Sequence, residues 1–382
     1  MSNWPRVPLS QVANSVDYGV TASASRESVG PKFLRITDIQ ANGVDWRQVP
    51  WCECSVREAK EANLQPGDIV FARTGATTGK TFLIEDCPED AVFASYLIRV
   101  RLVKEIDPHF VNQFFQSKDY WAQISKGARG VAQPGVNATT LKALSIPLPS
   151  LPEQRRIAAI LDKADELSAK RREALAQLDS LTQSIFIEMF GDPRQLPSSW
   201  PKSPLKALGR VTTGRTPPSS KEGMFGGDVP FITPGDLENE EPAKRTLTEE
   251  GVAEVNPVRA GAALVCCIGT VGKLGMAKVR SAFNQQINAV EWCDAVDDVY
   301  GLAALRFLKG QLAAQAASTT VPILNKSAFE KFEIAVPPLT LQQTFATRIQ
   351  AVESLKATHR AALAELDALF ASLQHRAFNG GL

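Results

Sequence analysis

Apolar positions recur every three or four residues along a stretch in the middle of the chain, residues 153–190. The stripe consists of Ile157, Ile160, Ala164, Leu167, Ala174, Leu178, Leu181 and Ile185, with Arg171 as its one interruption. This spacing places the apolar side chains along one face of an α-helix. Because the pattern lasts about five heptads without an internal glycine or proline, it predicts a coiled-coil helix about 55 Å long.

The same pattern returns 188 positions downstream, where Phe345 stands in the place of Ile157. The tetrapeptide Leu178-Asp179-Ser180-Leu181 becomes Leu366-Asp367-Ala368-Leu369 at the same offset. The offset also holds before the helix, for Asn137 with Asn325, Ile146 with Ile334, Pro149 with Pro337 and Gln154 with Gln342. A register this long indicates a tandem duplication of a globular segment followed by a long helix.

Each globular segment is predicted to be rich in short strands. In the first segment, β-prone runs cover residues 33–36, 69–72, 82–84 and 96–100, and a helix starts at Asp107-Pro108. The parallel runs of the second segment are residues 231–233, 261–268 and 283–290. We therefore expect an α+β fold with globular domains over residues 1–150 and 192–339, a central coiled-coil helix over 151–191 and a C-terminal coiled-coil helix over 340–382.

Composition is typical of a soluble globular protein, with 44% hydrophobic and 22% charged residues among 382. No apolar run is long enough to cross a bilayer and the first ten residues lack the layout of a signal peptide, so a cytoplasmic location is expected. The 42 basic and 41 acidic residues give a formal charge of +1, which does not by itself indicate nucleic-acid binding. Any such role must rest on local patches and on architecture.

The six cysteines and three histidines do not predict a metal site. The closest pairs, Cys52 with Cys54 and Cys266 with Cys267, lack the CxxC spacing typical of zinc ligands, and thiols in a reducing compartment are expected instead. The acidic clusters at 238–241 and 294–298 lack the spacing of a calcium loop. No GxSxG or HExxH motif occurs, so we expect no catalytic residue and no cofactor in this chain.

A glycine-containing segment, residues 73–81, could bind the phosphates of a nucleotide or those of DNA. A nucleotide phosphate loop needs four residues between its glycines and a helix after them, whereas Gly75 and Gly79 enclose three residues and a strand follows. The better functional interpretation is a hairpin tip whose Arg73, Thr77, Thr78 and Lys80 offer donors to phosphates and base edges. An ordinary solvated hairpin fits the bare residues equally well.

Other polar loops stand at corresponding places of the two copies. They contain Thr21 and Thr216 after the paired glycines Gly19 and Gly214, Arg215 beside Thr216, Lys273 in the shorter second hairpin, Lys126, Arg129 and Gln133 before the central helix, and Lys326 near their counterpart. The amides of Asn284-Gln285-Gln286 are able to read adenine. Because such a run more often caps a turn or faces water, we expect that role for it.

Four stretches combine into a recognisable pattern: residues 67–75 with Gly79-Lys80, residues 146–157, the helix end Phe190-Gly191-Asp192-Pro193, and the closing Phe378-Asn379-Gly380-Gly381. In this pattern, which spans nearly the whole chain in two copies, the sequence resembles the specificity subunit of type I restriction-modification systems. In the second copy, Cys267-Ile268 stands where Arg73-Thr74 stands in the first.

The resemblance implies two target recognition domains, each reading one half of a split DNA sequence, and two helices packed as an antiparallel coiled coil that acts as a ruler. A rod of about 55 Å corresponds to about one and a half turns of B-DNA. The implied partners are two modification subunits, which carry S-adenosylmethionine and methylate an adenine in each half-site, and a restriction/translocase subunit that uses ATP and magnesium. We expect the exposed helix faces and the proline-rich lead-ins to dock the modification subunits.

The residues expected to contact DNA are Thr21, Arg73, Thr74, Thr77, Thr78, Lys80, Lys126, Arg129, Gln133, Arg215, Thr216, Lys273 and Lys326. Two less favoured functions have distinct signatures. A protein scaffold with two globular domains on a coiled coil would bind duplex DNA with no salt-dependent affinity. An enzyme that uses residues 75–80 for nucleotide phosphates would bind a nucleotide without partners and would lose it on Lys80→Ala.

Overall fold

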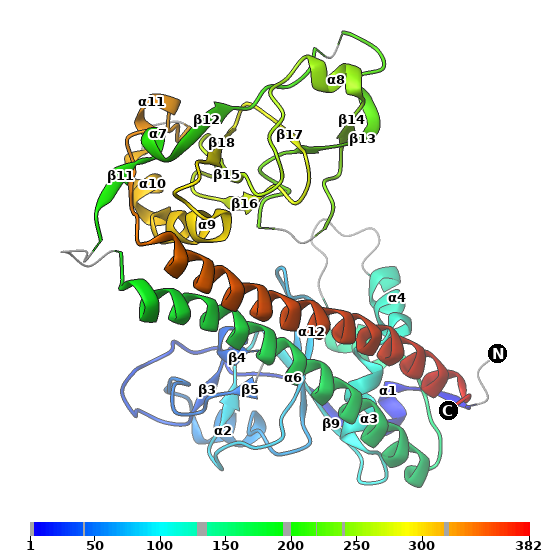
Figure 1. The fold of residues 1–382 in the computed structure, drawn as a ribbon. Helices are drawn as coiled ribbons and strands as arrows, with labels where there is room; N and C mark the ends of the chain where they lie inside the picture. The colour runs from blue at the N-terminus through cyan, green and yellow to red at the C-terminus, as the bar shows by residue number, and fades with distance from the viewer. Residues whose placement is uncertain are drawn as a thin grey trace. The chain divides into compact units, whose positions relative to one another are not determined.

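The computed structural model describes residues 4–40, 43–127, 136–193, 200–218, 220–238, 241–316 and 321–382. The chain divides into two units, Met1–Arg172 with Ala361–Leu382, and Glu173–Arg360. Each unit contains one strand-rich domain and parts of two long helices, α6 (Leu151–Phe190) and α12 (Leu339–Asn379), shown in Figure 1. The predicted α+β fold and tandem duplication are confirmed.

The domain of the first unit precedes α6. Its strands are β1 (Arg6–Pro8), β2 (Ala13–Tyr18), β3 (Phe33–Leu34), β4 (Ile39–Gln40), β5 (Gly43–Val44), β6 (Ile69–Ala72), β7 (Thr81–Leu83), β8 (Val92–Phe93), β9 (Leu97–Leu102) and β10 (Ser145–Pro147). Its helices are α1 (Leu9–Val12), η1 (Ile36–Asp38), α2 (Val56–Glu61), α3 (Pro108–Phe114), α4 (Lys118–Gly127) and α5 (Ala138–Lys142).

The domain of the second unit lies between α6 and α12 in the sequence. Its strands are β11 (Lys202–Pro204), β12 (Gly209–Thr213), β13 (Phe225–Ile232), β14 (Thr246–Leu247), β15 (Ala263–Cys266), β16 (Leu274–Met276), β17 (Ala282–Phe283), β18 (Ile287–Trp292) and β19 (Glu333–Ala335). Its helices are α7 (Leu205–Leu208), α8 (Glu249–Ala253), α9 (Asp298–Phe307), α10 (Lys309–Gln315) and α11 (Lys326–Phe329).

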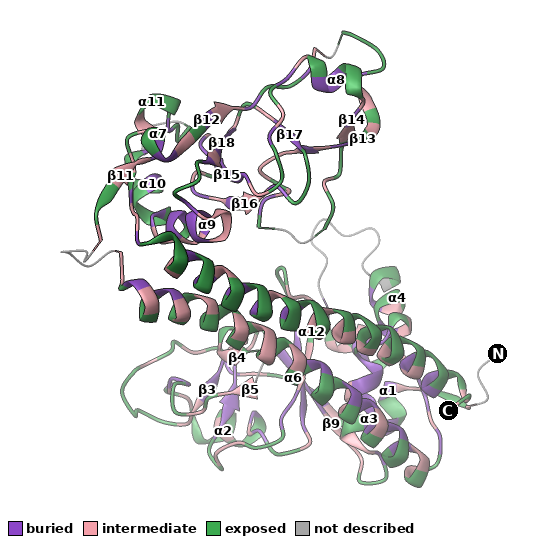
Figure 2. Cartoon of the chain, in the orientation of Figure 1, coloured by how far each residue is buried: buried purple, intermediate pink, exposed green. Residues whose placement is uncertain are grey.

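The two domains share one sheet topology. The order is β2-β9-β6-β7 in the first and β12-β18-β15-β16 in the second, with antiparallel neighbours throughout. Side chains of β6 alternate between two cores: Ile69 and Phe71 pack toward α3 and α6, and Val70 packs on the opposite face. Because both faces are covered, the strand is apolar and buried at every position. Figure 2 shows buried residues in purple within each domain and exposed residues in green along much of α12.

One predicted strand is shorter than expected. The sequence predicts a strand over residues 33–36, but β3 ends at Leu34 and Ile36 begins the 3₁₀ helix η1. The carboxylate of Asp38 accepts a hydrogen bond from the backbone N–H of Arg35 at 2.9 Å and so caps this turn. The local cap therefore overrides the β propensity of the run.

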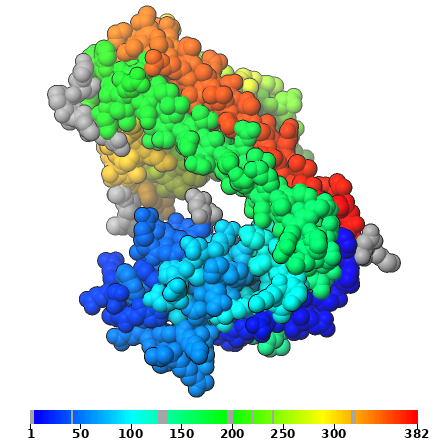
Figure 3. Space-filling model, turned by 90° about the horizontal axis from the view of Figure 1, so that it is seen from below, coloured from blue at the N-terminus to red at the C-terminus, as the bar shows by residue number. Residues whose placement is uncertain are grey.

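Helices α6 and α12 run antiparallel in each unit. In the first, Arg156 contacts the carbonyl of Leu382 and Arg172 pairs with Asp367 at 2.8 Å. In the second, Lys356 pairs with Asp179 at 2.8 Å. Figure 3 shows the two helices side by side, with the N-terminal segment next to the end of α12, where the indole N–H of Trp4 donates to Ala377 O. The antiparallel helix pair implied by the resemblance is confirmed.

The buried seam of the helices differs from the predicted stripe. Its buried positions repeat at four-and-three spacing, as Ile157, Leu161, Ala164 and Ser168 in α6 and as Phe345, Ile349, Val352 and Lys356 in α12. Leu167 and Leu181, predicted to belong to the stripe, are 41% and 42% exposed. The seam instead includes the polar residues Ser168 and Lys356. Adjacent rows of side chains on a helix have the same spacing, so packing against the partner helix determines which row is buried.

A buried glutamine joins each long helix to its own domain. Gln154 accepts a hydrogen bond from the N–H of Asp107 at 2.9 Å and donates one to Pro149 O at 2.9 Å. Gln342 makes the equivalent bonds in the second unit, to the N–H of Asp297 at 2.9 Å and to Pro337 O at 2.8 Å. The repeat thus preserves the attachment of helix to domain as well as the fold.

Candidate nucleic-acid interface

The predicted hairpin of the first unit is formed by β6 and β7. Its tip is closed by two backbone hydrogen bonds, from Ala72 N–H to Lys80 O at 2.9 Å and from Gly79 N–H to Ala72 O at 2.8 Å. Gly75 and Gly79 both have a φ of +83°, which glycine adopts without strain. The Thr78 hydroxyl donates to Gly75 O at 2.7 Å. A strand follows the segment, so it lacks the helix N-terminus that a nucleotide phosphate loop requires.

Helix α4 supports the tip from one side. The Tyr120 hydroxyl donates to Gly79 O at 2.6 Å, and burial raises the pKa of Tyr120, which keeps the hydroxyl protonated as a donor. A Cβ at position 79 would lie 3.1 Å from the Trp121 ring. The tip is therefore held in one position, while Lys126 at the far end of α4 is exposed.

Arg73 is exposed at the base of the tip. Its guanidinium carbon lies 5.0 Å from the centroid of the Tyr18 ring, within cation–π range. Among the residues that the structure describes, no carboxylate pairs with Arg73. The backbone of Arg73 is fixed on both sides, since its N–H donates to Tyr96 O and its carbonyl accepts from Val136 N–H. An arginine stacked in this way keeps its N–H donors for a ligand.

The second unit repeats this backbone frame. Cys266 N–H donates to Lys273 O at 2.8 Å and Gly272 N–H donates to Cys266 O at 3.0 Å. Cys267 N–H donates to Gln286 O, as Arg73 N–H does to Tyr96 O. Cys267 therefore occupies the position of Arg73, as the alignment of the copies predicted. Its side chain is buried, and burial raises the pKa of the thiol to about 12.

A glycine turn borders the hairpin in each unit. A Cβ on Gly19 would lie 2.1 Å from Phe93 O, and one on Gly214 would lie 2.2 Å from Asn284 O, so only glycine allows this close approach. Thr21 and Thr216 follow these turns and are exposed. The turn and the hairpin thus meet at the same end of each sheet.

The predicted DNA-contact residues separate into groups by location. Those at the sheet end of the first unit are Thr21, Arg73, Thr74, Thr77, Thr78 and Lys80, and those at the equivalent end of the second are Arg215, Thr216 and the half-buried Lys273. Lys326 begins α11 and lies 3.5 Å from Glu330. Arg129 and Gln133 lie outside the described residues.

Sequence reasoning missed one residue of this surface and assigned another to solvent. Tyr18, the stacking partner of Arg73, is 55 positions away in the sequence and ends β2, a strand that the sequence analysis did not predict. Gln285 accepts a hydrogen bond from the Thr216 hydroxyl at 2.7 Å, so it is more than a solvated amide. Both contacts depend on tertiary structure.

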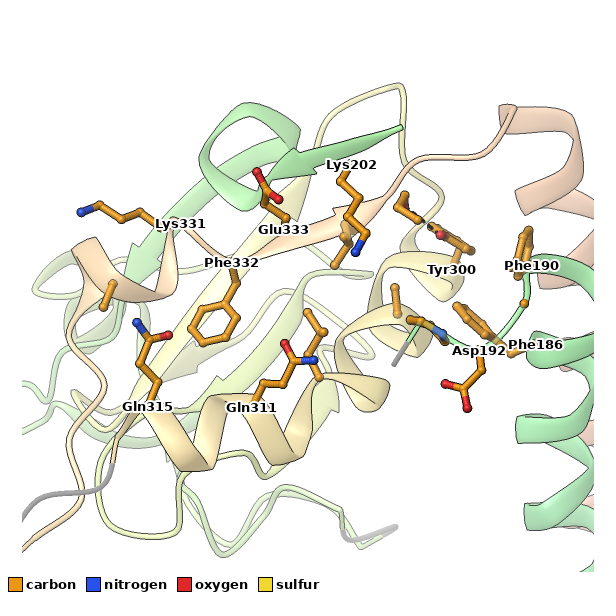
Figure 4. Close-up of a pocket in the computed structure, with 17 residues that line it drawn as sticks. Phe186, Phe190, Asp192, Lys202, Tyr300, Gln311, Gln315, Lys331, Phe332 and Glu333 are labelled. Carbon is orange, nitrogen blue, oxygen red and sulfur yellow. Dashed lines mark hydrogen bonds between the residues drawn. The ribbon is translucent and has the colours of Figure 1, made fainter. Parts of the chain in front are cut away.

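A separate pocket of about 500 Å³ lies in the second unit, between the end of α6 and β11 (Figure 4). Phe186 and Tyr300 line one part of it and Lys202 another. At the strand position of the first unit that corresponds to Lys202, Arg6 pairs with Asp119 at 2.7 Å. The pocket contains none of the residues predicted to contact DNA.

The described part of the chain contains neither a helix suited to span a membrane nor a cluster of metal ligands. No helix there is long and apolar enough to span a bilayer. Within the same residues, no group of three or more histidine, cysteine or acidic side chains is arranged to hold a metal ion.

Comparisons with known proteins agree on one family. The family model described as "Type I restriction modification DNA specificity domain" matches residues 1–178 and 197–368. The chain is 24% identical over 376 residues to the type I restriction enzyme MjaX specificity subunit of Methanocaldococcus jannaschii, covering 92% of this chain and 87% of the relative. It is 27% identical over 437 residues to the HindI specificity subunit of Haemophilus influenzae, covering 92% and 94%.

A solved structure has the same fold. The type I restriction-modification S subunit from M. genitalium superposes with a TM-score of 0.64 at 14% identity, covering 99% of this chain and 96% of the other.

Proposed function

Because this chain belongs to the family of type I restriction modification DNA specificity domains, we propose that each of its two domains reads one half of a split DNA target. The observation that carries the proposal is the repeated frame of hairpin and glycine turn, which offers polar side chains at one end of each sheet. Phosphate contacts by these side chains would fix register, and base contacts would supply specificity. The two half-sites then differ wherever the side chains on the frame differ.

The proposed assembly contains two modification subunits and, for cleavage, restriction subunits. The modification subunits would carry S-adenosylmethionine and methylate one adenine in each half-site, and the restriction subunits would use ATP and magnesium. The internal duplication supports a stoichiometry of two modification subunits, since it offers two equivalent surfaces to identical partners. The exposed pairs Leu167 with Leu355 and Leu181 with Leu369 follow the repeat offset, and we propose that they belong to these docking faces.

The long helices are proposed to set the gap between half-sites. Helix α6 has 40 residues, which corresponds to about 60 Å, or somewhat less than two turns of B-DNA. Insertion of one helical heptad in both helices would then lengthen the unread gap. The number of unread base pairs is the quantity that reports this change.

The test is co-expression of the chain with its modification subunit, followed by sequencing of methylated adenines across the host DNA. The expected result is one split motif with a methylated adenine in each half and a fixed gap. Replacing residues 191–340 by the second domain of a relative should change one half only. Methylation that is absent, or that does not depend on this chain, would contradict the proposal and favour a protein scaffold.

A further inference from the structure

One amide side chain of the second unit is oriented for recognition. Gln285 is exposed in the turn between β17 and β18, and its Oε1 accepts a hydrogen bond from the Thr216 hydroxyl at 2.7 Å. Thr216 is itself fixed, because the preceding Arg215 donates its N–H to Phe283 O at 3.0 Å. The two residues are 69 positions apart, so this contact is a product of the fold.

The amides on either side of Gln285 are occupied with each other. Asn284 Nδ2 donates to Gln286 Oε1 at 2.9 Å, and the Asn284 Oδ1 accepts from Gln286 N–H at 3.2 Å. Among the described residues, Thr216 is the one hydrogen-bond partner of the Gln285 side chain. Of the three consecutive amides, Gln285 is therefore the exposed one, whereas Asn284 and Gln286 are half-buried and bonded to each other.

The groups that Gln285 retains match adenine. An amide oxygen has two lone pairs, so after the bond from Thr216 it still accepts one hydrogen bond, and both Nε2 hydrogens remain. One acceptor beside one donor is the pattern that pairs with N6 and N7 of adenine in the major groove. Fixing the amide in advance also lowers the conformational entropy lost on binding.

The first unit places its long polar side chain elsewhere on the same frame. Ser95 corresponds to Gln285, since the turns are closed by the equivalent bonds Leu97 N–H to Ala94 O and Ile287 N–H to Asn284 O. A serine is too short to reach as far as a glutamine. Conversely, exposed Arg73 corresponds to buried Cys267.

We infer that the two domains read their half-sites with different chemistry. Gln285, positioned by Thr216, reads an adenine in the half-site of the second domain, and Arg73, stacked on Tyr18, reads a guanine through O6 and N7 in the other. This inference rests on the proposed function and adds to it the base class that each domain selects.

The experiment uses the full chain with its modification subunit and compares the methylated motif of each variant with that of the wild type. Gln285→Ala is expected to reduce discrimination at one position of one half-site by about tenfold to a hundredfold, with the other half unchanged. Gln285→Glu keeps an acceptor and loses the donors, so its preference should move from adenine to cytosine. Arg73→Ala should relax a guanine in the opposite half.

Two matched variants separate recognition from structure. Ser95→Ala changes the corresponding residue of the first domain and is expected to leave both halves of the motif as they are. Thr216→Ala should relax the same position as Gln285→Ala, and Thr216→Ser, which keeps the hydroxyl, should restore it.

The outcomes are distinguishable from a failure of the proposed function. If the wild-type complex yields no split motif, the proposed function is wrong. If it yields one and Gln285→Ala leaves every position as strict as before, or relaxes the half that Arg73→Ala relaxes, the inference is wrong. If Gln285→Ala abolishes methylation altogether, Gln285→Glu is the deciding variant. A change of base preference from adenine to cytosine supports the inference, and an unchanged preference overturns it.

Discussion

Replacing Gln342 by alanine is expected to destabilise the second unit by about 4 kcal/mol. Its buried side chain accepts from Asp297 N–H and donates to Pro337 O at 2.8 Å and to Ala295 O at 3.0 Å. Truncation removes three hydrogen bonds, worth about 0.5–1.5 kcal/mol each, and leaves the buried Pro337 carbonyl without a donor, which adds about 1–3 kcal/mol. Gln154 makes two such bonds, so Gln154→Ala is expected to cost about 3 kcal/mol.

The measurement is urea unfolding of the full chain with hydrogen exchange followed at α9 and at α3. Exchange is needed because a chain of two units does not unfold in one step, and each helix reports on its own unit. Gln343→Ala is the matched control, since Gln343 is the exposed neighbour of Gln342 on α12 and its loss should change stability by less than about 0.5 kcal/mol.

A charged variant tests the hydrogen bonds of the Gln342 side chain. Gln342→Glu retains an acceptor for Asp297 N–H but, when ionised, has no donor for the two carbonyls, and burial raises the pKa of such a carboxyl. Stability should therefore be lowest near neutral pH and recover as the pH falls and the carboxyl regains a proton. A Gln342→Ala cost below about 1 kcal/mol, or equal loss of protection in α3 and α9, would refute the reasoning.

Three further outcomes follow from the helix seam and the hairpin. Ser168→Ala should stabilise the first unit by about 1 kcal/mol in urea unfolding, because the buried hydroxyl has no partner among the described residues; a less stable variant would contradict this. Burial lowers the pKa of Lys356, but the carboxylates of Asp179 and Glu353 outweigh burial, so the net shift of the pKa is upward. The charged Lys356 therefore contributes to folding stability below about pH 10.4, and this contribution is lost as the pH rises through the pKa of the folded state. Lys356→Met should accordingly differ from the wild type by under about 1 kcal/mol at pH 7 and lose less stability above pH 10.4; equal alkaline loss would argue against the ion pairs. Lys80→Ala should weaken binding to all DNA sequences alike and reduce the salt slope by about one, and an altered methylation motif would count against a phosphate contact.

Local patterns in the sequence predict much of the fold. Short apolar runs bounded by turn residues are sufficient to predict β6, β7 and the hairpin between them, because the two glycines leave few alternatives. The long helices follow from periodicity, and their ends follow from glycine, with Gly191 at a φ of +83° and Gly380 at +75°. Here the determining interactions lie within a few residues of one another.

The helix seam shows where local reasoning fails. A search for apolar spacing selects Leu167 and Leu181 and passes over Ser168 and Lys356 because they are polar. Which row is buried depends on the partner helix, and Lys356 is buried because Asp179 on that helix pairs with its charge. The identity of the seam is therefore a tertiary property.

The candidate interface was predictable in position and not in detail. Alignment of the two copies correctly predicted that Cys267 occupies the position equivalent to Arg73, since equivalent residues of a duplication share a backbone frame. The contacts of Arg73 with Tyr18 and of Thr216 with Gln285 join residues 55 and 69 positions apart. No periodicity or spacing rule reports such contacts, and these are the contacts on which the proposed base preferences depend.

The core of the first unit has a consequence for biosynthesis. Phe378, near the end of α12, packs on the rings of Phe110 and Phe114 with centroids 5.5 and 5.3 Å apart, and Ala377 is buried beside them. The ribosome must therefore translate residues 361–382 before the N-terminal domain acquires its complete core, whereas the second unit is a continuous stretch that emerges earlier. Vectorial synthesis would let the C-terminal domain mature first, the reverse of the usual order. A premature stop codon in the last two turns of α12 would accordingly harm the domain made first.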